Sequence, residues 1–211
     1  RTRDEVIRRE LRQFEGAYYD ASKIQLSRRR IDRTSFFSEV TVDTQPVEGS
    51  ADQIDVTYSV KERPTGSLLV GIGFSSVEQF AVSASIRQSN AFGTGKFISA
   101  NINSGRVNTV YALSYHNPYY TIDGVSQGFD VYKRETDASG LSVAPYRTDA
   151  LGGGMKFGYP ISEVTSVDFG FNLESVELTT FSNSPPQYIT FVNDFASQYR
   201  YGALTAGWQR D

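Results

Sequence analysis

Residues 124–128, Gly-Val-Ser-Gln-Gly, match the Gly-x-Ser-x-Gly pattern in which a serine hydroxyl can act as a nucleophile. That chemistry needs the serine on a sharp turn between a strand and a helix, with a histidine as its base. Residues 129–133 alternate like a strand, so the sequence predicts no helix after the motif. His116 is the one histidine of the chain and precedes the motif by eight positions. We therefore expect no hydrolase, and no enzyme of another kind.

The remaining residue types give little support to metal, cofactor or nucleic-acid chemistry. One histidine without any cysteine makes neither a metal site nor a disulfide. Residues 152–154 are three glycines, but the Lys-Ser/Thr pair of a phosphate-binding loop does not follow them. The net charge of −3 argues against nucleic-acid binding, and the run at residues 28–30, three arginines, is typical of a solvated helix face. We expect no cofactor, no metal and no nucleic-acid partner.

Charge and glycine divide the chain unevenly. Of the 45 Asp, Glu, Lys and Arg residues, 24 lie in the first 65 positions, whereas 16 of the 18 glycines lie from residue 66 onward. This change indicates two domains in different solvents, and we place them at residues 1–64 and 65–211. The chain shows no signal peptide and starts inside a domain, so we expect an upstream part.

Residues 1–64 have the pattern of a small α+β domain. Apolar residues at three- and four-residue steps predict a helix over residues 3–14. A second helix, capped by Asp20 or Ser22, runs to residue 33. Two alternating segments around a Gly-Ser turn then predict an antiparallel hairpin, at residues 36–47 and 53–62. The order helix-helix-strand-strand leaves a sheet edge for a preceding strand that is missing here.

From residue 66 onward the sequence alternates with a period of two. Apolar side chains share one face of each segment, and small or polar side chains share the other. Eight candidate antiparallel strands result, each about ten residues long, the length that a tilted strand needs to cross a bilayer. Their apolar faces include Val70, Val82, Ala100, Leu113, Val131, Met155, Phe171 and Leu204.

The connections between these strands also alternate in character. Compact turns at residues 90–96 and 160–166 contrast with longer polar connections at 136–147 and 177–198, which is typical of outer-membrane barrels. A soluble sandwich could bury the same alternating faces, so both architectures remain open. Tyrosines near strand ends and charges on the opposite face favour lipid: Tyr115, Tyr119, Tyr120, Tyr159, Tyr199, Tyr201, Arg87, Lys156, Asp168 and Glu174. We expect the two carboxylates to pair with Lys156 or Arg87.

Several stretches resemble the BamA family of outer-membrane β-barrel assembly factors, in the family's order and spacing. They are residues 14–18 (Phe-Glu-Gly-Ala-Tyr), 60–66 (Val-Lys-Glu-Arg-Pro-Thr-Gly), 71–73 (Gly-Ile-Gly), 92–95 (Phe-Gly-Thr-Gly), 117–126 (Asn-Pro-Tyr-Tyr-Thr-Ile-Asp-Gly-Val-Ser) and 157–161 (Phe-Gly-Tyr-Pro-Ile). The resemblance implies a barrel-proximal POTRA domain in the periplasm. It also implies that the N-terminal half of a larger outer-membrane barrel follows.

The resemblance further implies assembly and insertion of nascent β-barrel proteins into the bacterial outer membrane, in contact with its lipid. The first barrel strand would be a lateral-gate edge that pairs with client strands: Gly66, Ser67, Leu68, Leu69, Val70, Gly71, Ile72, Gly73 and Phe74. Its glycines would ease opening of the edge, or would serve sheet curvature alone. Glu15 would contact an accessory lipoprotein of the BAM complex.

Other functions and assembly states are compatible with the same pattern. A related POTRA-barrel transporter for two-partner secretion or autotransporter assembly is the alternative, and a plain porin is disfavoured because it needs no docking module. An open half-barrel also exposes two strand edges, so self-association through them is expected.

Overall fold

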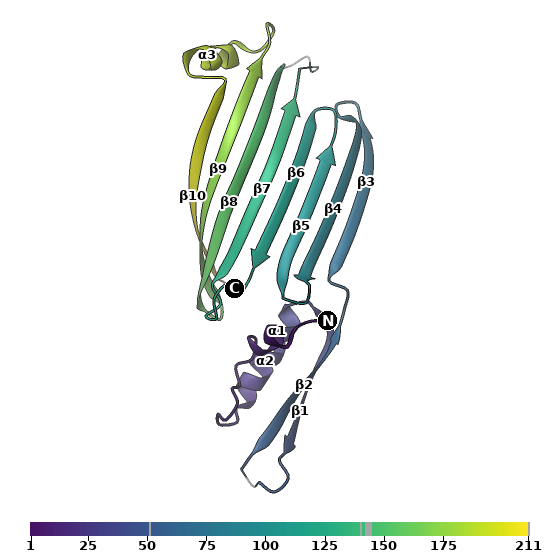
Figure 1. Cartoon of the computed structure of the whole chain (residues 1–211), viewed down its shortest axis with the longest axis vertical. Coiled ribbons are helices and arrows are strands. Elements are labelled where there is room, and N and C mark those ends of the chain that lie inside the picture. Colours follow the sequence, from purple (N-terminus) through teal and green to yellow (C-terminus); the bar gives the residue numbers. More distant parts are fainter. Residues whose placement is uncertain (51, 140, 142–144, 211) are drawn as a thin grey trace. The chain divides into compact units, whose positions relative to one another are not determined.

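The structure is a computed structural model that describes residues 1–50, 52–139, 141 and 145–210. It contains two compact units, one of residues 1–66 and 89–96 and one of residues 67–88 and 97–211. Figure 1 shows the elements of both. The expected domain boundary after residue 64 remains a prediction.

The N-terminal unit contains the predicted helix-helix-strand-strand order. Its elements are α1 (Asp4–Arg8), α2 (Ala21–Arg33), β1 (Phe37–Pro46) and β2 (Ile54–Glu62), with β1 and β2 paired antiparallel. The hairpin is therefore confirmed. Buried side chains of both helices and of β1 form its core with Phe36: Val6, Ile31, Phe36, Phe37 and Val40.

Helix α1 is shorter than the sequence predicts, because its i→i−4 hydrogen bonds stop after Arg9, and the N–H groups of Glu10 and Leu11 bond three residues back, to Ile7 and Arg8. The backbone N–H of Arg12 donates to the hydroxyl of Ser27 at 2.7 Å instead of continuing the helix. Ser27 is fully buried and donates in turn to the carbonyl of Lys23. Val6 of the apolar stripe lies in the core, and Ile7 and Leu11 pack against it. The second half of the stripe is not helical, and its last apolar residue, Phe14, is exposed.

The start of α2 confirms Asp20 as its cap. The Asp20 carboxylate accepts hydrogen bonds from the N–H groups of Ser22 at 2.8 Å and Lys23 at 3.4 Å. Hydrogen bonds from Ser22 hold the pKa of the Asp20 carboxyl below its ordinary value. The cap therefore stabilises α2 above about pH 4, and the contribution is lost as the pH falls through the lowered pKa.

The arginine run in α2 is not simply a solvated face, contrary to the sequence-based expectation. Arg30 forms an ion pair with Glu10 at 2.9 Å, and both side chains are largely buried. Arg28 donates from Nε to the carbonyl of Val40 on β1 at 3.1 Å. Two of the three arginines therefore bind α2 to the rest of the domain.

The turn at residues 89–96 belongs to the N-terminal unit, although it connects two strands of the large sheet. The carbonyl of Gly93 accepts the N–H of Arg3 at 2.8 Å, and the Asn90 amide donates to the Thr2 hydroxyl at 2.8 Å. Gly93 has a φ of +73°, and a Cβ there would lie 2.1 Å from the carbonyl oxygen of Arg1. Glycine is thus required for the chain start to pack on this turn.

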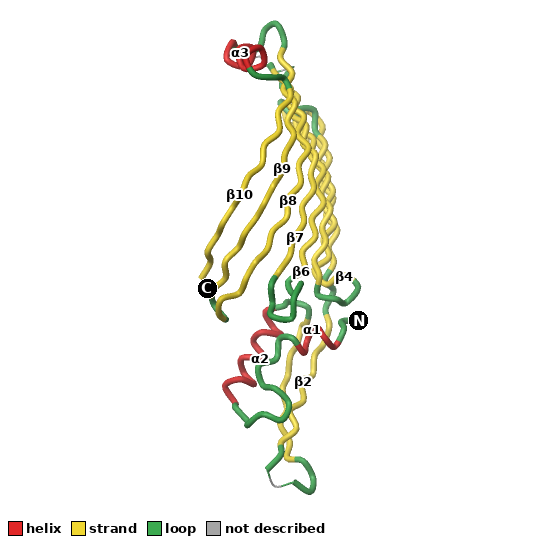
Figure 2. The backbone as a smooth tube through the Cα atoms, turned by 60° about the vertical axis from the view of Figure 1, so that its left-hand side comes forward, coloured by secondary structure: helices red, strands yellow, loops and turns green. Residues whose placement is uncertain are grey.

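The C-terminal unit is built on one antiparallel sheet of eight strands, which confirms the predicted number. In chain order they are β3 (Gly66–Ser75), β4 (Gln79–Ala91), β5 (Lys96–Ser104), β6 (Asn108–Asn117), β7 (Ser126–Asp137), β8 (Tyr146–Ser162), β9 (Thr165–Thr180) and β10 (Gln198–Arg210). Each strand pairs with its neighbours in sequence, so β3 and β10 are the two edges. Figure 2 shows the strands side by side.

The apolar face of this sheet is exposed. Leu113 is 54% exposed, Phe169 57% and Leu204 84%. A soluble sandwich needs a second sheet against such a face, whereas the described strands after residue 65 form a single sheet in sequence order. An open sheet with an exposed apolar face is what the sequence predicts for part of a membrane barrel. Among the described residues, no helix has the length and hydropathy to cross a membrane.

The connection at residues 177–198 contains a helix that the sequence analysis missed. Strand β9 runs on to Thr180, and α3 (Pro186–Asp194) starts with proline in its first turn, where no N–H is needed. Tyr188 packs on Tyr146 of β8, with ring centroids 5.2 Å apart, and Phe191 packs on Tyr199 of β10 at 5.8 Å. In the other long connection, residues 140 and 142–144 lie outside the described residues.

Replacing the fully buried Ile31 tests the core of the N-terminal unit. We expect Ile31→Ala to lower its free energy of unfolding by about 2–5 kcal/mol, because the surroundings of a buried side chain cannot close the cavity. Hydrogen exchange of the α2 amides in the intact protein measures the loss. Ile54→Ala on β2 is the matched control, since Ile54 is 47% exposed. Equal protection losses in both variants would contradict this account of the core.

Candidate functional site

Strand β3, which contains all nine residues of the predicted client-pairing edge, is an edge strand of the sheet. Within the described residues, β4 is the one strand paired with it. Consecutive side chains of β3 are about two-thirds exposed on both faces: Leu68, Leu69 and Val70. The arrangement presents backbone N–H and C=O groups along one side of the strand, where another strand can pair.

Two glycines of β3 have different surroundings. A Cβ on Gly71 would lie 2.6 Å from Oγ of Ser83 on β4, so glycine permits close packing at that position. A Cβ on Gly73 would have no neighbour within 4 Å, so packing on β4 does not explain that glycine.

Glu15 lies on the surface of the N-terminal unit, in the connection between α1 and α2. Its carboxylate is an exposed partner of Arg8, with 3.3 Å between Oε1 and Nη1, and Arg8 also binds Asp4 at 2.6 Å. Two exposed aromatic side chains lie close to it in sequence, Phe14 and Tyr18. A charged group between apolar side chains is available to a docking protein, although the structure assigns no such role.

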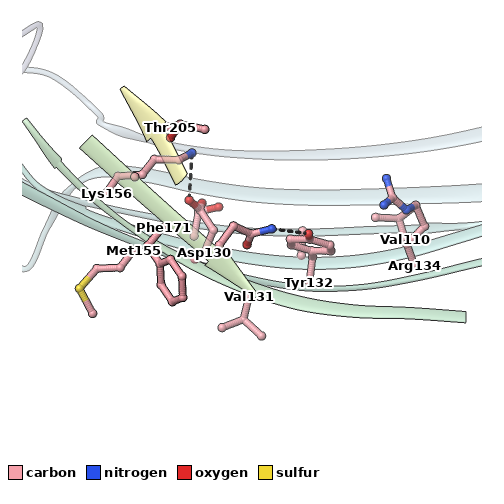
Figure 3. Close-up of a pocket in the computed structure, with 14 residues that line it drawn as sticks. Val110, Asp130, Val131, Tyr132, Arg134, Met155, Lys156, Phe171 and Thr205 are labelled. Atoms are coloured by element: carbon pink, nitrogen blue, oxygen red, sulfur yellow. Dashed lines mark hydrogen bonds and ion pairs between the residues drawn. The ribbon is translucent and has the colours of Figure 1, made fainter. Parts of the chain in front are cut away.

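The polar face of the sheet carries an ion pair. Lys156 on β8 lies 3.2 Å from the carboxylate of Asp130 on β7. Figure 3 shows Lys156 and Asp130 on one face of the sheet, while Met155 and Phe171 extend from the other. The sequence analysis expected Lys156 to pair with Asp168 or Glu174. That expectation is wrong, because the register places glycines beside Lys156: Gly128 on β7 and Gly170 on β9.

Glu174 on β9 is the buried carboxylate of this face, with 6% of its surface exposed. It accepts a hydrogen bond from the hydroxyl of Tyr132 on β7, and lies 3.5 Å from the guanidinium of Arg134. The Asn172 amide donates to the Tyr132 hydroxyl at 3.1 Å. The charge is thus stabilised by two residues of β7, two strands away from β9.

Gly152 makes this contact across β8 possible. In the register, Gly152 is opposite both Tyr132 and Glu174, so the tyrosine ring crosses directly over it. A Cβ at residue 152 would lie 2.5 Å from Cζ of Tyr132. Gly152 and Gly154 of the three-glycine segment therefore leave room for side chains of the polar face, Tyr132 and Asn172.

The polar face is hollowed rather than flat. Two adjoining depressions of about 480 and 610 Å³ lie on it, and both include Ser114, Asp130, Lys156, Gly170 and Thr205. The second also contains Arg87, His116 and Asp168. Charged and small side chains of this kind are typical of a water-filled barrel lumen.

The Gly-x-Ser-x-Gly motif does not form a nucleophile elbow in the structure. Ser126 of the Gly-x-Ser-x-Gly motif is the first residue of β7, so a strand follows the serine, as predicted, and not the helix of a nucleophile elbow. In the described part of the chain, no group of three or more His, Cys, Asp and Glu side chains is placed to hold a metal ion.

Residues 90–211 match the family model of the Omp85 superfamily domain, and residues 1–63 match the POTRA model, described as a surface antigen variable number repeat. The chain belongs to the Omp85 superfamily. Its resemblance to BamA extends over nearly the whole length, with 36% identity over 210 residues to outer membrane protein assembly factor BamA of Neisseria meningitidis serogroup B. That alignment covers 99% of this chain and 26% of the relative.

A second BamA protein, from Nitratidesulfovibrio vulgaris, is 33% identical over 179 residues, which are 84% of this chain and 22% of that protein. The Omp85 chain thus spans about a quarter of the length of these curated relatives. Its fold matches the crystal structure of BamA from Haemophilus ducreyi lacking POTRA domains 1–3, with a TM-score of 0.77 and 30% identity over 100% of this chain and 42% of that one. The predicted POTRA domain followed by antiparallel barrel strands is confirmed.

CdiB from Acinetobacter baumannii has a similar fold, with a TM-score of 0.63 over 100% of this chain and 41% of that one. The identity is 12%, so the likeness concerns the fold alone.

Within the Omp85 fold, sequence reasoning missed the Tyr132–Glu174 contact and its dependence on Gly152. Alternation places all three on the polar face, but only the register of three strands brings them together.

Enlarging Gly152 tests the packing of the polar face. We expect Gly152→Ala to cost about 1–3 kcal/mol in the free energy of unfolding, because the added methyl group displaces the Tyr132 ring. The temperature at which the sheet loses its compact form on a heat-modifiable gel measures the effect. The control is Gly207→Ala on β10, where the nearest neighbour of a Cβ would be Cβ of Asp168, 3.9 Å away. An unchanged temperature for Gly152→Ala would rule out the clash.

Proposed function

We propose that this chain is part of an assembly factor that inserts β-barrel proteins into the bacterial outer membrane, with β3 as the edge on which client strands pair. The POTRA domain would lie in the periplasm and the sheet in the membrane. The observation that carries the proposal is the exposed edge strand of an Omp85 sheet, in a chain whose BamA relatives are named assembly factors.

The physical argument concerns unpaired backbone groups in lipid. A strand that enters the bilayer alone exposes N–H and C=O groups, and each unsatisfied group costs several kcal/mol there. When a client strand pairs with β3, the backbone N–H and C=O groups on one side of the client become hydrogen-bonded before the client leaves the aqueous phase. No nucleotide or metal is needed for this step, because the ladder hydrogen bonds supply the free energy.

The alternative function is secretion through a related POTRA barrel. The fold is compatible with it, since CdiB has the same architecture. The assembly function is favoured because the BamA relatives are similar in sequence along most of the chain, at 33–36% identity, whereas CdiB is 12% identical. Reconstitution in liposomes separates the two functions, since an assembly factor leaves clients in the bilayer and a transporter passes them across it.

The proposed partners follow from the same arrangement. Nascent outer-membrane proteins would bind β3, outer-membrane lipid would contact the apolar face, and an accessory lipoprotein would bind near Glu15. The strand edges β3 and β10 could also pair between two copies of the chain. Glu15 already pairs with Arg8, with 3.3 Å between Oε1 and Nη1. A cationic group of the lipoprotein would therefore displace Arg8 or share the Glu15 carboxylate with it.

A proline scan of β3 tests the client-pairing edge. Successive N–H groups of an antiparallel strand point to opposite sides, so Leu69 and Gly71 share one side and Val70 and Ile72 share the other. Proline at one pair removes hydrogen bonds to β4, and proline at the other removes donors from the outer edge. We expect every variant to impair insertion of a urea-unfolded small β-barrel protein into proteoliposomes.

The thermal stability of each variant separates the two causes. Proline variants at the pair that faces β4 should lose both thermal stability and insertion activity. Proline variants at the pair that faces outward should lose insertion activity while their thermal stability stays unchanged. Outward-facing proline variants that insert the client at the normal rate would disprove the edge mechanism.

A charge reversal tests the proposed lipoprotein contact. We expect Glu15→Lys to reduce copurification of the accessory lipoprotein, because it places a second cation beside Arg8 in place of an acceptor. Glu5→Lys on α1 is the matched control, since Glu5 is also exposed and paired with an arginine, Arg3 at 3.5 Å. The contact is refuted if both variants retain the lipoprotein equally.

A further inference from the structure

The end of β3 is connected to the neighbouring hairpin through Glu78, in the β3–β4 connection. The carboxylate of Glu78 accepts hydrogen bonds from the N–H groups of Val107 at 2.9 Å and Asn108 at 3.1 Å. It also accepts the side-chain amide of Asn108 at 2.5 Å. One carboxylate thus binds three donors of the β5–β6 connection.

The backbone around Glu78 extends this connection in both directions. The N–H of Glu78 donates to the hydroxyl of Ser75, the last residue of β3, at 2.9 Å. The carbonyl of Glu78 accepts the N–H of Arg106 at 3.1 Å. The close approach requires Gly105, because a Cβ there would lie 2.3 Å from Oε2 of Glu78.

The β5–β6 connection is itself bound to the end of β7. The carbonyl of Val107 accepts the N–H of Asp137 at 2.7 Å, and Oδ1 of Asn108 accepts the hydroxyl of Thr136 at 3.1 Å. Val107 is buried. A continuous series of hydrogen bonds therefore joins the end of the edge strand, through Glu78 and Asn108, to the long strands in the middle of the sheet.

We propose that Glu78 is a positioning residue that holds the β3–β4 hairpin against the sheet. Glu78 thereby controls how readily β3 moves from its resting position to pair with a client strand. Strand β3 pairs with β4 and β4 pairs with β5, and Glu78 adds a separate attachment at the end of the hairpin. The carboxylate is held by N–H dipoles and an amide. Water can replace these donors in turn, so the attachment can be released without unfolding the hairpin.

This inference rests on the proposed client-pairing function of β3, and two variants test it by different routes. Glu78→Gln keeps the shape of the side chain but turns an N–H group toward N–H donors. Gly105→Ala keeps Glu78 and displaces its carboxylate. Glu163→Gln, in the β8–β9 connection, is the control for removal of a carboxylate from a turn of the same sheet.

The first measurement is the mobility of the hairpin. The chain has no cysteine, so cysteines introduced at Ser76 and Leu151 carry the only nitroxide labels, and electron-spin measurements in liposomes give the distribution of distances between them. We expect a broader distribution in Glu78→Gln and Gly105→Ala than in the parent protein or in Glu163→Gln. An unchanged distribution in both variants would overturn the proposal.

The second measurement is the insertion rate of a urea-unfolded small β-barrel protein. We expect both variants to raise it by a factor of about five, the effect of losing roughly one net hydrogen bond from the resting edge. A broader distribution with an unchanged rate would refute the control of the edge by Glu78. A parent protein that inserts no client would refute the proposed function instead, and the distance distributions would still decide whether Glu78 holds the hairpin.

Discussion

In the proposed setting, alternate side chains of each strand of the large sheet face hydrocarbon and water, and the backbone of the strand has to stay hydrogen-bonded to its neighbours. In hydrocarbon an unpaired N–H or C=O group is costly, so the ladder hydrogen bonds are the interaction on which the rest of the structure depends. Side chains such as Leu113 and Phe169 extend from one face and are exposed, while Asp130 and Lys156 pair on the other. The same constraint makes the strand edge β3 a reactive feature, because it is where the ladder stops.

The two faces solve different packing problems. On the apolar face, large exposed side chains follow one another without complementary neighbours, as the proposed contact with lipid allows. On the polar face, long side chains cross neighbouring strands, and the positions beneath them have to be glycine. Gly152 below Tyr132 is an instance of this requirement, and Gly105 in the β5–β6 connection similarly leaves room for the carboxylate of Glu78 at the end of the sheet. Both glycines allow a carboxylate to be reached by distant donors, and both contacts stabilise the order of the strands.

Much of this fold could be predicted from the sequence, because the period-two alternation is local and strong from β3 to β10. The Asp20 cap and the β1–β2 hairpin were predictable for the same reason. Other features depend on residues distant in sequence. The N–H of Arg12, beyond the end of α1, binds Ser27 fifteen positions away, and Glu174 reaches Tyr132 through the register of three strands. Helix α3 was missed because its aromatic residues pack on β8 and β10, although its two prolines are a local indication.

The central claim is that alternate side chains of the sheet face hydrocarbon and water. Nitroxide labels at single cysteines along β9, residues 167–174, test it most directly in liposomes, with oxygen and a water-soluble nickel chelate as relaxing agents. The account predicts that collision with oxygen is high at Phe169, Phe171 and Leu173, and that collision with the chelate is high at Asp168 and Asn172, with a period of two. Low accessibility to both agents at every position on the apolar face would show a protein core there and would contradict the membrane assignment.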